Sequence, residues 1–321
     1  MEESRIKQVL TFADIFKGIL SISIRIPYLI VAFRKVLTLK QDARESWGRL
    51  LELNSEKYPD RPALKWNDSC MTYEELNKRT NRYAHYLVSK GLKKGDVVTV
   101  ILENRPELFM VYCAAAKIGA ISCMINTNLR QQSLLHCLDH VKGKMFIIGE
   151  EVIGQFLEVK TQVISTNNHN LYYVSDQGDL SVPNGFIDIN EKTKGMSDNN
   201  PFTVKDIRLK DPVAYVFTSG TTGGMPKAAV IFHKRLISST IWYGKILQRT
   251  KPTDTIYCPL PFFHTNGLVV GWPATMAKGA ALAVRRKFSV TRFWEDVRKF
   301  KATCFIYVGE LPRYLLNQKE N

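Results

Sequence analysis

The pattern of hydrophobic and polar positions first shows helical periodicity between residues 72 and 91. Thr72 and Glu75 have the spacing of a capping box, which closes the first turn of a helix. Gly91 stands where a C-cap glycine would end that helix. The apolar positions that fall on one helical face are Tyr73, Leu76, Tyr83 and Leu87. This segment therefore predicts a capped helix with one buried face.

Downstream of this helix, short apolar runs alternate with helical segments. Strands are predicted at residues 97–102, 120–125 and 145–148, and helices at 106–118 and 131–140. A short helix is also expected at 47–53. Strands that alternate with helices indicate a parallel sheet with helices on its faces. The predicted fold class is therefore α/β, with layered sheets and helices.

The second half of the chain continues the alternation after a polar stretch at residues 191–211, which predicts a linker. Ser289 is expected to cap a helix with an apolar face. That face consists of Val290, Phe293, Trp294, Val297 and Phe300. The other predicted elements are strands at 213–217, 228–232, 281–284 and 302–308, and helices at 233–247 and from 309 onward. The chain is accordingly divided into an N-terminal segment, 1–45, a first α/β subdomain, 46–210, and the start of a second, 211–321.

An apolar stretch at residues 15–33 is interrupted by Lys17, Arg25 and Pro27. A spanning helix needs about 20 mostly apolar residues, and a central arginine is costly there. No small-residue cleavage site follows, which disfavours a cleaved signal peptide. The flanking cations suit a segment lying among lipid headgroups: Arg5, Lys7, Arg34, Lys35 and Lys40. We expect membrane association without a simple span, and a core helix broken at Pro27 is the alternative.

The formal net charge of +15 favours an anionic partner, which can be nucleic acid, a membrane surface or an anionic substrate. Nucleic acid is the least favoured of these, because the chain has no zinc finger and no basic region leading into heptads. The six cysteines form no Cys-x-x-Cys pair, and several lie inside apolar runs. We expect reduced thiols packed as small hydrophobic side chains.

His136 and His140 are spaced to share one face of the helix predicted at 131–140, which raises a metal-site hypothesis. The zincin pattern would require Glu at position 137, where this chain has Cys. No third ligand is evident from the sequence. A solvated helix face is therefore the favoured interpretation.

The loop between the strands predicted at 213–217 and 228–232 combines three glycines, four hydroxyl side chains and one lysine. Glycines let backbone N–H groups point toward one centre, hydroxyls add donors, and lysine adds positive charge. Such a loop suits a polyphosphate or another anion. Its ten residues are Thr218, Ser219, Gly220, Thr221, Thr222, Gly223, Gly224, Met225, Pro226 and Lys227.

A polar hairpin turn is the simplest alternative for this loop. The P-loop of nucleotide hydrolases is excluded, because it ends in Gly-Lys-Ser/Thr and leads into a helix. Here Pro226 precedes Lys227, and Ala228 opens a predicted strand. The loop closely resembles the phosphate loop of the adenylate-forming superfamily, which includes acyl-CoA synthetases and luciferases. That pattern runs Thr-Ser-Gly-Thr-Thr-Gly, one variable residue, then Pro-Lys, whereas this chain carries both Gly224 and Met225 at the variable position.

Other segments carry the same resemblance. Asn104-Arg105-Pro106-Glu107 and residues 126–129 are similar to acyl-CoA synthetases, and residues 259–264, PLPFFH, resemble the superfamily's Pro-Leu-aromatic-His segment. The latter resemblance places His264 near the carboxylate to be activated, and a core histidine is the alternative. Residues 285–317 narrow the resemblance to the fatty acid transport proteins, also called very-long-chain acyl-CoA synthetases (solute carrier family 27). A surface amphipathic helix with a basic face is the simpler interpretation of residues 285–301, and such a face could also meet a membrane.

The resemblance implies a two-step reaction, in which ATP and a fatty acid carboxylate form acyl-adenylate and pyrophosphate, and coenzyme A then takes the acyl group. It implies that the glycines, hydroxyls and Lys227 of the loop hold phosphates and that Thr221 contacts Mg²⁺. The expected partners are a long- or very-long-chain fatty acid and a membrane lipid surface, and a homo-oligomer is left open. The expected location is the endoplasmic reticulum, peroxisome or plasma membrane, with the catalytic part facing the cytosol.

The resemblance stops at Asn321, before the superfamily's adenine-binding segment, its Tyr-x-x-Thr-Glu stretch, its ribose-binding Asp and its C-terminal domain with a lysine for the reacting carboxylate. We therefore expect the N-terminal part of an adenylate-forming fold without its C-terminal domain, in an inactive or weakly active form. The alternative function is a non-catalytic, membrane-tethered lipid-binding fragment.

Overall fold

The computed structural model describes residues 11–23, 26–164, 170–176, 178, 181–218 and 225–317. The chain forms two compact units, residues 1–39 and residues 40–321. The larger unit contains two β-sheets, whose strands interleave along the sequence. The division at residue 210 thus remains a prediction, while each sheet draws strands from both sides of it.

The first sheet has seven strands in the order β7-β6-β5-β3-β4-β8-β9. Their bounds are β3 Val97–Ile101, β4 Ile121–Met124, β5 Met145–Gly149, β6 Asn170–Val174, β7 Ile187–Asp188, β8 Pro212–Thr218 and β9 Lys227–Phe232. All neighbours are parallel except β8 and β9, which form an antiparallel pair. The predicted parallel sheet is confirmed. The antiparallel pair follows from the short connection between its strands, since parallel strands need a longer crossover.

The second sheet has five strands in the order β12-β10-β11-β1-β2. Their bounds are β1 Pro62–Trp66, β2 Ser69–Thr72, β10 Thr255–Tyr257, β11 Ala281–Val284 and β12 Cys304–Phe305. The hairpin of β1 and β2 comes from the first quarter of the chain, yet β1 pairs in parallel with β11. This long-range pairing brings the predicted subdomains into one packed unit.

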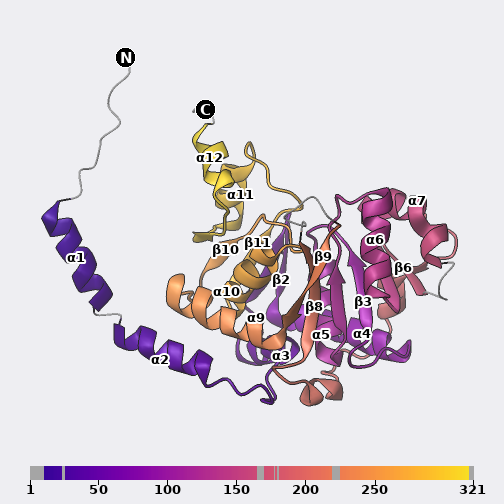
Figure 1. The fold of residues 1–321 in the computed structure, drawn as a ribbon, viewed down its shortest axis with the longest axis horizontal. Helices are drawn as coiled ribbons and strands as arrows, with labels where there is room; N and C mark the ends of the chain where they lie inside the picture. Colours follow the sequence, from indigo (N-terminus) through magenta and orange to yellow (C-terminus); the bar gives the residue numbers. More distant parts are fainter. Residues whose placement is uncertain are drawn as a thin grey trace. The chain divides into compact units, whose positions relative to one another are not determined.

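Helices form three layers around the two sheets (Figure 1). One face of the seven-stranded sheet packs against α6 Gln131–Val141 and α7 Ile153–Ile164. The main core lies between the sheets and contains α3 Trp47–Lys57, α4 Tyr73–Ser89, α5 Pro106–Ile118, α9 His233–Ser239 and α10 Trp272–Met276. The outer face of the five-stranded sheet packs against α11 Phe293–Phe300. The remaining helical segments of this unit are α8 Ile189–Thr193, α12 Glu310–Leu316, η1 Glu150–Val152, η2 Phe202–Asp206, η3 Thr240–Leu247 and η4 Asn266–Gly271.

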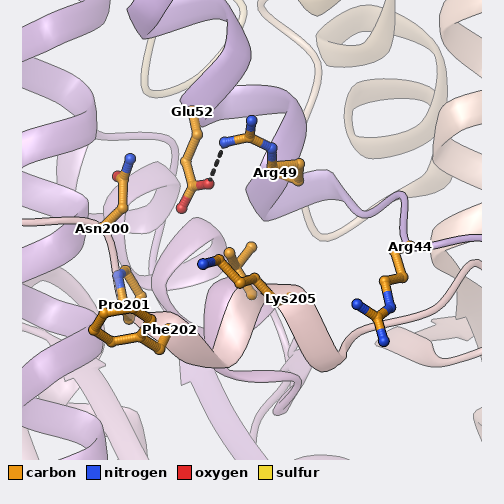
Figure 2. Close-up of a pocket in the computed structure, with 8 residues that line it drawn as sticks. Arg44, Arg49, Glu52, Asn200, Pro201, Phe202 and Lys205 are labelled. Carbon is orange, nitrogen blue, oxygen red and sulfur yellow. Dashed lines mark hydrogen bonds and ion pairs between the residues drawn. The ribbon is translucent and has the colours of Figure 1, made fainter.

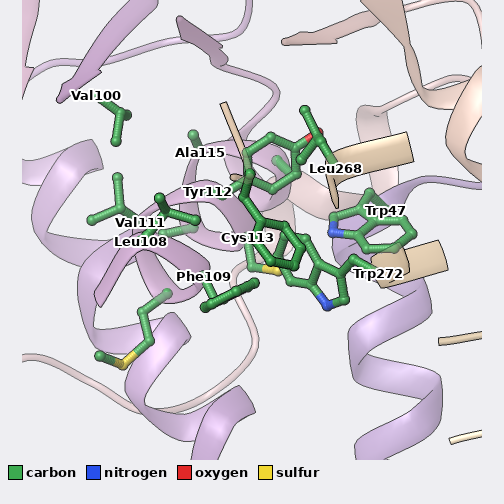
Figure 3. Close-up of a cluster of buried hydrophobic side chains, with 14 of the residues drawn as sticks. Trp47, Val100, Leu108, Phe109, Val111, Tyr112, Cys113, Ala115, Leu268 and Trp272 are labelled. Carbon is green, nitrogen blue, oxygen red and sulfur yellow. The ribbon is translucent and has the colours of Figure 1, made fainter. Parts of the chain in front are cut away.

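Helix α5 is the centre of the main core. It is buried on every side from Leu108 to Ile118, as expected of a helix enclosed between two sheets. Figure 3 shows its aromatic side chains meeting those of α3 and α10. Trp272 lies edge-on to Phe109 and to Trp47, with ring centroids 4.8 and 5.0 Å apart. These contacts attach α3 and α10 to α5 through large apolar surfaces.

Several predicted elements are confirmed. The capping box is present, because the Thr72 side chain accepts from the Glu75 backbone while the Glu75 side chain accepts from the Thr72 backbone. Gly91 follows the end of α4 with a φ of +77°, which a residue with a Cβ rarely adopts. Helix α5 begins and ends at the predicted residues.

Three predictions about the second half need correction. The supposed linker at 191–211 contains the end of α8 and all of η2, and it packs onto the main unit, where Asn200 accepts hydrogen bonds from Asn77 and Asn81. Ser289 is not a helix cap, because α11 begins at Phe293 and the Ser289 hydroxyl lies 3.1 Å from that of Thr291. The strand predicted at 302–308 is reduced to β12.

The N-terminal unit contains α1 Phe12–Ser23 and α2 Ile26–Leu37. Pro27 occupies the first turn of α2, where a missing N–H costs little. Many large apolar side chains on both helices are exposed, among them Phe12, Phe16, Val31 and Leu37. Within the described residues, no helix is both long enough and apolar enough to cross a bilayer. Arg25 lies outside the described residues.

Candidate active site

The predicted phosphate loop joins the only antiparallel pair of the first sheet's described strands. Thr218 ends β8 and lies opposite Lys227, the first residue of β9. The carboxyl ends of the parallel strands β3, β4 and β8 meet at this edge of the sheet, which is where α/β proteins place their ligand sites. Ser219, Gly220, Thr221, Thr222, Gly223 and Gly224 lie outside the described residues, so their predicted roles stay predictions.

The described flanks of the loop are open to solvent. Thr218, Met225 and Lys227 are exposed, and the Thr218 hydroxyl lies 3.4 Å from the carbonyl oxygen of Lys227. The Lys227 ammonium forms no ion pair with any described residue. An exposed cation without a carboxylate, placed at the end of a glycine-rich loop, fits a polyphosphate ligand.

Helix α6 supports the end of this loop through a histidine. The Nε2 atom of His136 lies 3.1 Å from the carbonyl oxygen of Pro226, and the side chain is half-buried. His140 stacks beside His136 at 5.9 Å and lies 6.2 Å from the Phe217 ring. The prediction of a solvated face therefore holds for the exposed His140 and is wrong for His136. Among the described residues, no group of three or more His, Cys, Asp or Glu side chains is arranged to hold a metal ion.

Asn104 connects the two sheets at the same edge. It follows β3, is buried, and donates from Nδ2 to the carbonyl oxygens of Leu260, at 2.9 Å, and Arg285, at 3.1 Å. Its Oδ1 accepts from the backbone N–H of Phe262 at 3.0 Å. One side chain thereby holds the Pro-Leu-Pro-Phe-Phe-His segment and the end of β11 against the first sheet.

His264 ends the segment that Asn104 holds. The backbone turns tightly, with the N–H of His264 donating to the carbonyl oxygen of Pro261 at 3.2 Å. The His264 ring lies 4.7 Å from the Phe263 ring and makes no hydrogen bond with a described residue. The ring is exposed by surface area, yet nearby groups partly desolvate it, which lowers its pKa. A neutral, accessible imidazole is suited to contacting a carboxylate without titrating at neutral pH.

A network of ion pairs follows the ends of β3 and β11. Arg105 is buried and pairs with Glu107 at 2.7 Å and with Glu151 at 3.1 Å. Glu103 pairs with Lys287 at 2.6 Å and with Arg286 at 3.6 Å, so the basic run after β11 bridges the sheets. Arg286 and Lys287 are among the basic residues that the sequence assigns to a surface that could meet a membrane, and here they form ion pairs within the protein. No sequence pattern identifies the pairing of Glu103 with Arg286 and Lys287, because these partners lie more than a hundred positions apart.

The phosphate loop, Asn104 and His264 all fall within a region that matches a known family. The family model described as AMP-binding enzyme matches residues 51–321. The chain belongs to the AMP-binding enzyme family. The match includes the phosphate loop, the Asn104 connection and His264, and it confirms the resemblance to adenylate-forming enzymes.

Curated relatives are fatty-acid enzymes and transport proteins. The medium/long-chain-fatty-acid–CoA ligase FadD6 of Mycobacterium tuberculosis is 32% identical over 292 residues, covering 91% of this chain and 47% of the relative. The long-chain fatty acid transport protein 2 of Rattus norvegicus is 34% identical over 275 residues, covering 83% and 43%. The resemblance to fatty acid transport proteins is confirmed. The chain spans about half the length of these relatives.

Solved structures of acyl-CoA ligases share the fold. A Mycobacterium tuberculosis fatty acyl CoA synthetase superposes with a TM-score of 0.72 at 22% identity, covering 85% of this chain and 51% of that one. The anthranilate CoA ligase AuaEII, in complex with anthranoyl-AMP, gives a TM-score of 0.75 at 18% identity, covering 84% and 50%. The predicted fold class, the N-terminal part of an adenylate-forming enzyme, is confirmed.

Proposed function

We propose that this chain supplies the ATP- and carboxylate-binding part of a fatty-acid–CoA ligase. The observation that carries the proposal is the position of Lys227, which forms no ion pair with a described residue. It stands at the end of the phosphate loop, on the edge to which Asn104 attaches the His264 segment. Family membership supports the adenylate-forming reaction, and the names of the relatives support a fatty acid substrate. ATP, Mg²⁺ and coenzyme A are the groups that this reaction requires.

The chemistry brings two anions together, because a fatty acid carboxylate must approach the α-phosphate of ATP. Fixed positive charge and backbone dipoles reduce this repulsion more than mobile water does. In the proposed site, Lys227 and the loop glycines bind the phosphates, and Thr218 is the first residue of the loop. Bound Mg²⁺ would neutralise phosphate charge, and Thr221 is the proposed contact on this chain. His264 borders the carboxylate, where its neutral form adds no charge that varies near pH 7.

We also propose that the N-terminal unit associates with a lipid surface without spanning it. Exposed Phe12, Phe16 and Val31 can enter the acyl region while Lys17 and the cations after residue 33 reach the headgroups. A poorly soluble fatty acid partitions into the same surface. If the chain binds lipid but not ATP, the alternative of a non-catalytic lipid-binding protein would describe it better.

The decisive experiment measures ATP binding to the full chain by calorimetry. We expect Lys227→Ala to weaken ATP binding about tenfold or more, since a charge-assisted contact is worth about 1.5–3 kcal/mol. Lys278→Ala is the matched control, because Lys278 is likewise exposed and without an ion pair among the described residues. Equal affinities of the wild type and Lys227→Ala would overturn the proposed role of the loop.

A further inference from the structure

A cavity lies away from the proposed active site, between α3 and the segment at residues 191–211. Its volume is about 370 Å³, within the range of small-molecule pockets. Figure 2 shows Arg49 and Glu52 on α3 along one wall and Lys205 on the facing segment. The lining residues are Arg44, Arg49, Glu52, Asn200, Pro201, Phe202, Val204 and Lys205.

A buried ammonium group fixes the inner wall of this pocket. Lys117 is fully buried, and its Nζ donates to Glu52 at 3.0 Å and to Asn200 at 3.0 Å. Asn77 and Asn81 of α4 complete its shell at 2.7 and 2.6 Å. Because each of these groups is held by several others, Glu52 and Asn200 are preorganised rather than free to rearrange.

A glycine sets the distance between α3 and α5 here. A Cβ at Gly48 would lie 2.7 Å from the Lys117 Cγ and 2.9 Å from its Cα. Only glycine therefore permits this approach of the helices. The wall of the pocket is a built feature of the fold.

The charges that line the pocket leave a positive surplus. Glu52 forms an ion pair with the buried Lys117 on the side away from the pocket. Arg49 pairs with Glu52 at 3.0 Å and with Glu56 at 3.1 Å. Arg44 and Lys205 form no ion pair with a described residue. The three lining cations against the one lining carboxylate leave two positive charges for a ligand, and Lys117 and Glu56, which do not line the pocket, cancel each other in this balance.

The rim carries an exposed aromatic ring. Phe202 is 83% exposed, and the ammonium of Lys205 lies 5.1 Å from the centroid of its ring. A protruding aromatic beside cations is a common arrangement where proteins meet the headgroup region of a bilayer. Arg44 also follows closely after the N-terminal unit, which ends at Leu39.

Helix α5 separates this pocket from the proposed active site. Pro106 begins the helix at the carboxyl edge of the first sheet, whereas Lys117 lies eleven residues on, near its other end. At 1.5 Å per residue, the two positions are about 16 Å apart along the helix. The pocket is therefore at the opposite edge of the sheet from the phosphate loop.

We propose that this pocket binds a phosphate monoester anion through Arg44, Arg49 and Lys205. A dianionic phosphate matches the surplus of two charges, and the guanidinium groups can each donate two hydrogen bonds to its oxygens. The same chemistry is presented by the headgroup of phosphatidic acid and by a soluble phosphate ester. The proposal does not depend on ligase activity.

The test uses the full chain on neutral phosphatidylcholine vesicles, with glycerol 3-phosphate titrated by calorimetry. We expect the double variant Arg44→Gln/Lys205→Gln to weaken glycerol 3-phosphate binding about tenfold or more, because it removes two of the three cations proposed to contact the phosphate. The double variant Lys192→Gln/Arg298→Gln is the matched control, because it removes two exposed cations that make no described ion pair. Its affinity should stay within about twofold of the wild type.

A second arm identifies the source of the phosphate. Phe202→Ser should reduce flotation with vesicles containing phosphatidic acid, relative to phosphatidylserine vesicles of equal surface charge, if the ligand is a lipid. It should leave both unchanged if the ligand is soluble, and either result supports a phosphate site. The proposal is wrong if the wild type binds neither glycerol 3-phosphate nor phosphatidic acid. It is also wrong if the pocket variant and the control variant lose affinity equally. Lys227→Ala serves as the discriminating variant, since it should weaken ATP binding and leave glycerol 3-phosphate binding intact.

Discussion

Replacing Asn104 with alanine tests how the two sheets position His264. The side chain is only 2% exposed and makes three hydrogen bonds, to the carbonyl oxygens of Leu260 and Arg285 and to the N–H of Phe262. Alanine would leave these three backbone groups without their partner in a buried place. No other described side chain bonds to them.

The magnitude follows from those three groups. Each buried polar group without a partner costs about 1–3 kcal/mol, and water entering the vacated space recovers part of that. We therefore expect Asn104→Ala to lower the free energy of unfolding by about 3–5 kcal/mol. Asn104→Asp should be similarly destabilising, because a carboxylate oxygen would face the carbonyl oxygens of Leu260 and Arg285.

The assay is urea unfolding followed by tryptophan fluorescence, combined with hydrogen exchange measured on peptides that cover residues 258–268. We expect faster exchange in these peptides in Asn104→Ala, since the segment before His264 loses its anchor. Asn128→Ala is the control, because its side chain is exposed and makes no hydrogen bond to a described residue, and it should stay within about 0.5 kcal/mol of the wild type. A loss below about 1 kcal/mol in Asn104→Ala, with unchanged exchange, would refute the connection.

Three further predictions concern other parts of the chain. Burial lowers the pKa of His233 to about 3, so as the pH falls the unfolded chain takes up this proton before the folded chain does. Stability that is present above about pH 6.5 should therefore be lost as the pH falls toward 3. Urea titrations at several pH values should show a flatter dependence of stability on pH for His233→Phe, and an unaltered dependence would contradict this account. Deleting Gly224 should tighten ATP binding if the extra residue widens the loop, and unchanged or weaker binding in calorimetry would show that the longer loop is accommodated. The N-terminal unit should bind vesicles yet be released by carbonate with its tag accessible to protease, whereas a carbonate-resistant, shielded tag would show a true span.

Local sequence signals were sufficient to predict most elements. The capping box at Thr72 and Glu75 and the buried helix α5 depend on neighbours within a few positions, so the sequence determines them directly. The phosphate-loop motif and the segment ending at His264 also pointed to the correct family, because both are contiguous runs with distinctive composition.

The tertiary structure decided what depends on distant partners. Three such features join residues far apart in the chain: β1 pairs with β11, Asn104 hydrogen-bonds to Leu260, and Lys117 hydrogen-bonds to Glu52. The polar composition of residues 191–211 predicts a linker. Burial of Lys117 is stable only because Glu52 and three asparagines surround it, and one of those, Asn200, comes from the supposed linker. Such mutual satisfaction of buried polar groups is a property of the folded arrangement, and no local pattern encodes it.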